Sequence, residues 1–97
     1  MANSESRNGS GESITAAELA VIARETVTSL TGFPAESVSG LQWEGDKWLV
    51  TVDVCELERV PSTTDVMASY AVQLDVRGEI LGYRRTHRFI RGHAEGD

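Results

Sequence analysis

The sequence is poor in the features that build disulfide frameworks and membrane anchors. It has a single cysteine, Cys55, so no disulfide can form within the chain and a secreted, disulfide-stapled scaffold is excluded. No run approaches the roughly 20 consecutive apolar residues that span a bilayer. The N-terminal stretch is neither basic nor apolar, as a signal peptide would be. We therefore expect a cytoplasmic protein without a membrane segment.

Specific catalytic and metal-binding patterns are also missing. The only histidines are His87 and His93, whereas a metal site needs several convergent ligands, and the arginines around His87 disfavour a cation. No glycine-rich phosphate loop follows a strand-like run. Cys55 and His87 have no spacing typical of a nucleophile and its base, so Cys55 is interpreted as a small apolar residue. We predict no catalytic residue, no metal and no cofactor, and hence no enzyme.

Acidic residues alternate with hydrophobic ones in the middle of the chain. They are Asp53, Glu56 and Glu58. Such residues act as general acids only in a cleft that raises their pKa values. We interpret them as a solvated outer face of a sheet. A pocket between helix and sheet with convergent ionisable groups would favour an enzyme instead.

Length and composition predict one small domain between two polar tails. Residues 1–13 and 92–97 contain too few apolar side chains to offset the entropy of ordering, so we expect flexible tails there. Residues 14–91 then form a single domain. A chain of this size buries only about 60% of its unfolded surface, which leaves little room for a deep substrate cavity.

The first element is predicted to be a helix over residues 16–31. Thr15 and Glu18 have the spacing of a capping box, and Gly32 is the residue type that commonly ends a helix. The apolar stripe expected to face the core consists of Leu19, Ile22, Ala23, Val27 and Leu30.

After the helix the hydrophobic period changes to two, which predicts strands. The expected strands cover residues 38–44, 47–57, 65–74 and 79–90, and Gly45-Asp46 forms a turn between the first two. In the second strand the core face is expected to carry Trp48, Val50, Val52 and Val54. Short turns favour pairing in sequence order. The predicted fold is therefore α+β, with one N-terminal helix on a three- to four-stranded antiparallel meander.

The charge distribution is uneven. The net charge of −6 argues against general affinity for nucleic acid. Four arginines nevertheless fall close together in the last strand, and alternation along it would put Arg84 and Arg88 on one face and Arg85 and Arg91 on the other. Arginine with interleaved aromatics is typical of interface hot spots. The candidate partner-binding residues are Tyr83, Arg84, Arg85, Arg88, Phe89 and Arg91.

This basic strip has more than one interpretation. Its arginines can protect an edge strand from unwanted pairing, or they can pair with the chain's own surplus carboxylates. It can also dock an acidic partner protein. RNA binding is the weakest alternative, because the rest of the molecule would repel phosphate.

The order of several short motifs resembles a known family. The motifs include Lys47-Trp48-Leu49-Val50 with Arg59-Val60-Pro61, Asp65-Val66-Met67-Ala68-Ser69-Tyr70, and Gly82-Tyr83-Arg84-Arg85 followed by Arg88-Phe89-Ile90-Arg91-Gly92. In this order they resemble the gas vesicle protein GvpO family, over roughly residues 16–92. No single motif among them is diagnostic.

The resemblance implies a role in building gas vesicles, the hollow protein shells that give some bacteria and archaea buoyancy. It implies an accessory protein required for gas vesicle formation, located in the cytoplasm and associated with gas vesicles. The family offers no catalytic residue or cofactor to transfer. We expect an assembly factor or chaperone-like protein whose partners are other gas vesicle proteins, with no nucleic acid and no membrane. The alternative is a generic small protein- or peptide-binding module that uses a sheet edge and has no catalytic activity.

Overall fold

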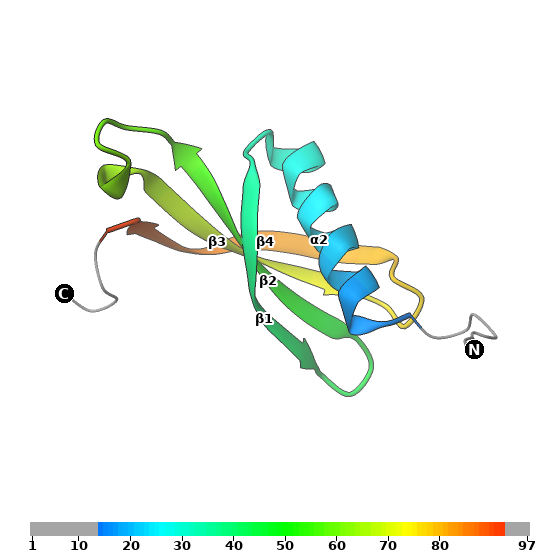
Figure 1. The fold of residues 1–97 in the computed structure, drawn as a ribbon. Coiled ribbons are helices and arrows are strands. Elements are labelled where there is room, and N and C mark those ends of the chain that lie inside the picture. Colours follow the sequence, from blue (N-terminus) through cyan, green and yellow to red (C-terminus); the bar gives the residue numbers. More distant parts are fainter. Residues whose placement is uncertain (1–13, 93–97) are drawn as a thin grey trace, which may run out of the picture.

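The computed structural model describes residues 14–92, and these form one helix on a four-stranded antiparallel sheet (Figure 1). The strands pair in sequence order, β1-β2-β3-β4, which confirms the predicted α+β meander. The elements are α2 (Ala16–Thr31), β1 (Ala35–Trp43), β2 (Trp48–Leu57), a 3₁₀ turn η1 (Ser62–Thr64), β3 (Val66–Leu74) and β4 (Ile80–Ile90). The predicted tails, residues 1–13 and 92–97, lie outside the described residues except for Gly92, so the domain division stays a prediction.

The helix begins and ends where the sequence signals predict. The Thr15 hydroxyl accepts a hydrogen bond from the Glu18 amide at 3.1 Å, and the Glu18 carboxylate accepts one from the Thr15 amide at 3.0 Å. Gly32 adopts the left-handed conformation, with φ of 80°, and its amide donates to the Thr28 carbonyl at 2.9 Å. These bonds satisfy backbone groups that a helix end leaves without partners.

The core lies between α2 and one face of the sheet. Alternate residues of β2 and β3 meet one stripe of the helix, and the cluster consists of Leu19, Ala23, Val27, Val50, Val52, Val54, Ala68, Tyr70, Val72 and Leu74. The predicted core face of β2 is confirmed, with Trp48 packed against the cluster from its edge. Trp48 also contacts its cross-strand partner Trp43, at a ring-centroid distance of 5.1 Å.

One residue of the predicted helix stripe is not in the core. Leu30 is 54% exposed and lines an open hollow together with Ile22, Thr26 and Ile80. The reason is the position of the helix, which packs on β1, β2 and β3 and leaves β4 largely uncovered. The prediction for Leu30 is therefore wrong.

Within residues 14–92 no helix is long and apolar enough to cross a membrane.

Candidate interaction surface on β4

The basic strip lies on an edge strand that the helix does not cover. β4 pairs with β3 along one side only, and its C-terminal half runs away from α2 toward the η1 connection (Figure 1). All side chains from Tyr83 to Arg88 are exposed. β4 is therefore an edge strand, as one interpretation of the arginines requires, and the strip is open to a partner as far as the described residues go.

A β-bulge in β4 changes which arginines share a face. The register passes from Tyr70 opposite Arg85 to Ser69 opposite His87, so Thr86 is an extra residue without a partner. A bulge of this kind reverses the alternation beyond it. The simple alternation expected from the sequence therefore holds from Tyr83 to Arg85 and fails beyond Arg85.

The bulge puts Arg85 and Arg88 on the same side of the sheet as the helix. Arg85 lies opposite Tyr70 and Arg88 lies opposite Ala68, and both of these β3 residues belong to the core cluster. Arg84 lies opposite Ala71 and faces the other side of the sheet. The expectation that Arg88 shares a face with Arg84 is wrong, because it assumed a strand without a bulge.

A single carboxylate, that of Glu56, binds both of these arginines. Nη1 of Arg85 donates to the two carboxylate oxygens at 3.2 and 3.0 Å, and Nε of Arg88 donates to Oε1 at 3.0 Å. The Glu56 side chain is only 6% exposed, whereas those of Arg85 and Arg88 are 47% and 58% exposed. Two positive charges thus share one buried negative charge, and both guanidinium groups still reach solvent.

Glu56 is the member of this surface that the sequence analysis missed. It was interpreted as part of a solvated outer face with Asp53 and Glu58. The signal that could have placed it is the alternation of the strand. Glu56 follows Val54 by two positions, as Val54 follows Val52, and both valines are buried core residues, so Glu56 is expected on the core face. Its carboxylate lies on the core side of the sheet, where Arg85 and Arg88 bind it.

Arg91 has a different environment from the other arginines. Nε donates to Oδ2 of Asp65 at 3.0 Å, and the two Nη atoms donate to Glu36 at 2.7 and 2.6 Å. Asp65 is 4% exposed and also accepts a hydrogen bond from the Arg59 amide at 2.7 Å. For Arg91, as for Arg85 and Arg88 with Glu56, the interpretation as a partner of the chain's own carboxylates is confirmed.

The network around Arg91 stabilises the charged forms of its carboxyl groups. The hydrogen bond from Arg91 holds the pKa of Glu36 below its ordinary value of 4.5. The Arg59 amide, and after it Arg91, hold the pKa of Asp65 below 3.8, although burial opposes this. Saturated by two carboxylates, Arg91 has little left to offer a partner.

The remaining strip residues are divided between the two faces of β4. Phe89 opposes Met67 and its ring stacks on that of His87, with centroids 5.7 Å apart. Arg84 is exposed and has no ion pair with any residue of the described range 14–92. Tyr83 lies opposite Val72, on the helix side, where its ring contacts Tyr70 at a centroid distance of 6.2 Å. The strip therefore divides between the two faces of β4.

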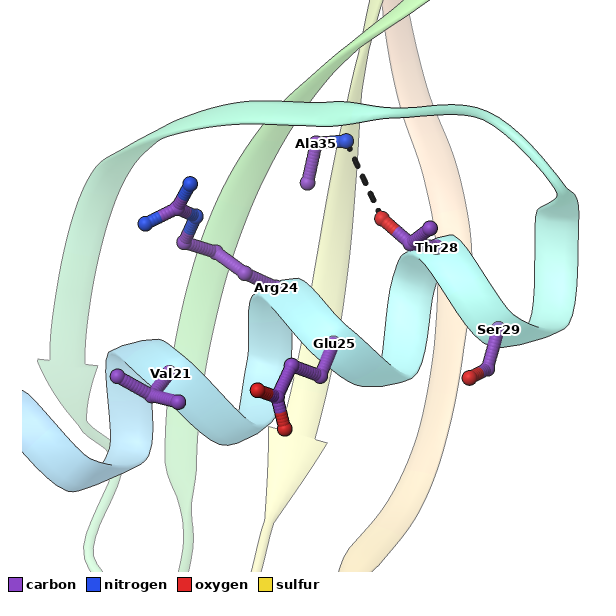
Figure 2. A pocket seen from close by; sticks show the side chains of 6 residues that line it. All are labelled: Val21, Arg24, Glu25, Thr28, Ser29 and Ala35. Carbon is purple, nitrogen blue, oxygen red and sulfur yellow. Dashed lines mark hydrogen bonds between the residues drawn. The ribbon is translucent and has the colours of Figure 1, made fainter.

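A hollow away from β4 lies between α2 and β1, and Figure 2 shows its lining. Ala35 donates its amide to Oγ1 of Thr28 at 3.2 Å at the end of this hollow. The titratable groups in the lining are Arg24 and Glu25, both exposed. Among residues 14–92 no three potential metal ligands gather in one place. This hollow collects no set of convergent ionisable groups.

The sequence was also compared with known proteins. The model of the family described as gas vesicle synthesis protein GvpO matches residues 2–95. Gas vesicle protein O of Streptomyces sp. (strain CB03234) is 48% identical over 69 residues, covering 71% of this chain and 54% of the relative. Gas vesicle protein O of Haloferax mediterranei is 33% identical over 73 residues, covering 74% of this chain and 52% of the relative.

A third relative, gas vesicle protein O1 of Halobacterium salinarum, is 30% identical over 83 residues, which cover 86% of this chain and 70% of the relative. The chain thus spans about half the length of the first two curated relatives that it matches. No solved structure matches it.

Proposed function

Because the chain belongs to the gas vesicle synthesis protein GvpO family, we propose that it is an accessory protein in gas vesicle formation that binds other gas vesicle proteins through β4. In this proposal the binding is non-covalent. The protein acts in the cytoplasm on the vesicle under construction, as an assembly factor or a chaperone for subunits prone to aggregate. It carries out no catalysis.

One observation carries the choice of surface. On the exposed edge strand β4, Arg85 and Arg88 share the single carboxylate of Glu56, and Arg84 forms no ion pair within residues 14–92. The local charge of this surface is positive although the chain as a whole is acidic, with a net charge of −6. Arginine is favoured in interfaces because its planar guanidinium makes several oriented hydrogen bonds at once. An acidic segment of a partner protein fits this surface.

The absence of catalysis in this proposal is supported by the filled core. Leu19, Val52 and Leu74 are fully buried between helix and sheet, at the place where a helix-on-sheet domain would hold a substrate. Cys55 is buried, and burial raises the pKa of its thiol. A raised pKa disfavours the thiolate that a nucleophile needs.

The test is complementation of a vesicle-forming host from which the gene is deleted. The test variant is Arg84→Glu/Arg85→Glu/Arg88→Glu. It leaves Arg91 unchanged, because Arg91 holds the fold together. The matched control is Arg24→Glu/Arg59→Glu/Arg77→Glu, which makes the same change in net charge on exposed residues outside β4.

Buoyancy and electron microscopy score the outcome, and co-purification of vesicle proteins with the tagged chain scores the binding. We expect wild type and control to restore vesicles and to recover vesicle proteins, and the β4 variant to fail in both. Equal vesicle formation by all three chains would reject β4 as the working surface. Normal vesicles in the deletion strain would instead favour the generic peptide-binding module, for which the open edge of β4 is the supporting observation.

A further inference from the structure

We propose that the partner segment binds to β4 as an added strand: an extended, acidic stretch pairs with the free edge of β4 and places alternate carboxylates against Arg85 and Arg88. This inference rests on the proposed function in using the same surface. It adds the backbone conformation of the partner, its charge pattern and the groups that it contacts.

The edge of β4 suits strand addition better than the other edge of the sheet. At the opposite edge, α2 packs against β1 and Thr28 accepts a hydrogen bond from the Ala35 amide. Glu36 of β1 is further held by Arg91. β4 has no such cover from the described residues and is longer, so its outer N–H and C=O groups can pair with an extended chain.

The spacing of the two arginines matches an extended strand. Because Thr86 is bulged, Arg85 and Arg88 are neighbours along the ladder on one face, opposite Tyr70 and Ala68. Alternate side chains of a strand lie on one face, roughly 6–7 Å apart. Two acidic residues separated by one position in the added strand would therefore meet the two guanidinium groups.

Glu56 shows how a carboxylate binds here and leaves room for another. Three hydrogen bonds connect it to the two guanidinium groups, which have more N–H donors than these three use. The unused donors lie on side chains that are about half exposed. A second carboxylate can approach from the solvent side without displacing Glu56, and it would balance the second positive charge.

The same charges disfavour a second copy of this chain as the occupant. Two copies of β4 paired about a twofold axis would bring their arginines close to one another across the interface. Like charges on directly paired strands are destabilising. The occupant is thus a strand of another protein with carboxylates at alternate positions.

The experiment uses a blocked peptide of about eight residues in which valine and glutamate alternate, long enough to cover the bulge and its flanks. The chain is labelled with ¹⁵N, and amide hydrogen exchange and chemical shifts are measured at pH 7. We expect slower exchange at the β4 amides that do not pair with β3. Two control peptides test the charge and the backbone pairing separately. In the first, lysine replaces glutamate, which reverses the charge. In the second, proline at the central positions removes backbone donors but keeps the charge.

Variants assign the contacts. Arg85→Glu/Arg88→Glu should weaken binding of the valine-glutamate peptide by about tenfold or more, and Arg24→Glu/Arg59→Glu should leave it unchanged. Glu56→Gln should tighten it, because the internal carboxylate no longer neutralises the pair. Equal binding of the proline peptide would overturn strand addition, and so would protection at β1 in place of β4. Self-association of the free chain through β4 in a sizing experiment would identify a second copy as the occupant instead.

These outcomes separate this inference from the proposed function. If the peptide adds to β4 but the arginine variants still build vesicles in the host, strand addition stands and the role of β4 in vesicle formation fails. If the variants block vesicles but the proline peptide binds as well as the alternating one, β4 is the working surface and strand addition is wrong.

Discussion

Arg91, the residue after β4, contacts Glu36 of β1 at 2.6 and 2.7 Å, so that one side chain joins the two opposite edges of the sheet. The same guanidinium binds the buried Asp65, which precedes β3. The network also ties the end of β4 to the connection before β3, since the Gly92 amide donates to the Thr63 carbonyl. Of the four clustered arginines, Arg91 is the one that pairs with two carboxylates, and these ion pairs stabilise the fold.

The different environments of Arg91 and Arg84 predict different effects on stability. Arg91→Met leaves Asp65, which is 4% exposed, without its cationic partner, whereas Arg84→Met removes an exposed charge without an ion pair in the described range. Breaking a buried pair on one side is more costly than removing a solvated charge. In urea unfolding followed by tryptophan fluorescence, Arg91→Met should lower the midpoint clearly and Arg84→Met should change it little. Equal midpoints would show that the network contributes nothing.

The carboxyl groups bound by Arg91 predict a loss of stability in acid. The pKa values of Asp65 and Glu36 are lowered in the folded state from ordinary values of 3.8 and 4.5. Their contribution is therefore fully present above the unfolded-state pKa values and is lost as the pH falls through the lower folded-state values. Titration of these two carboxyl groups should leave the urea midpoint nearly unchanged between pH 7 and about 5. It should lower the midpoint when the pH is below 4.

Asp65→Asn provides the specific check on this pH dependence. It removes the carboxyl group that titrates, so the gap in unfolding free energy between wild type and variant should be largest near neutral pH and should narrow below pH 4. A gap that stays constant down to pH 3 would assign the acid sensitivity to other groups.

The elements of this fold were predictable because their signals are local. Thr15, Glu18 and Gly32 specify the helix ends through contacts within a few residues, and these contacts form as predicted. The buried face of β2 follows from alternation alone. β1 begins at Ala35 rather than at Val38. The Pro34 carbonyl accepts a hydrogen bond from the Cys55 amide, and the Ala35 amide donates to the Thr28 hydroxyl; no local pattern indicates either bond.

The composition of the candidate site was predictable, but its geometry was not. The arginines and aromatics of β4 are evident in the sequence. A strand that carries arginine on both faces cannot be buried on both, which favours an edge position. The bulge at Thr86, which groups Arg88 with Arg85, depends on pairing with β3. The contact of Arg91 with Glu36 joins residues 55 positions apart, from the two edges of the sheet, and no local pattern indicates it.

The core predicts a large difference between two identical substitutions in α2. Leu19 is fully buried in the cluster and Leu30 is 54% exposed, so Leu30→Ala is the matched control for Leu19→Ala. Removing a buried leucine side chain costs the lost transfer free energy and leaves a cavity, about 3 kcal/mol in total. The exposed leucine should cost below about 1 kcal/mol. Chemical denaturation measures the loss of unfolding free energy for both variants. Similar losses would mean that the helix packs on the sheet with a different face.

The burial of Cys55 predicts that its thiol reacts only after unfolding. It is 3% exposed, and burial raises its pKa, so the fraction of reactive thiolate in the native state is low. Because this is the only cysteine of the chain, the absorbance change with a disulfide reagent such as dithiobis(nitrobenzoate) reports on it alone. Labelling at pH 8 should be slow and should accelerate in urea with the same midpoint as the fluorescence of Trp43 and Trp48. Fast labelling of the folded chain would reopen a role for the thiol.

Two glycines in turns, Gly45 and Gly78, have the same backbone conformation and different surroundings. Gly45 has φ of 90° and Gly78 has φ of 87°, so alanine is strained at both positions. At Gly45 a β-carbon would meet nothing within 4 Å, and Gly45→Ala should cost only the backbone strain, about 1 kcal/mol. At Gly78 it would lie 2.7 Å from Cδ1 of Ile14 and 3.1 Å from Cδ1 of Ile22, where the helix start packs on the β3–β4 turn. Gly78→Ala should therefore cost roughly 1–2 kcal/mol more, because the isoleucines must move. Urea unfolding of the two variants measures the difference, and equal losses would mean that the start of α2 is not packed against this turn.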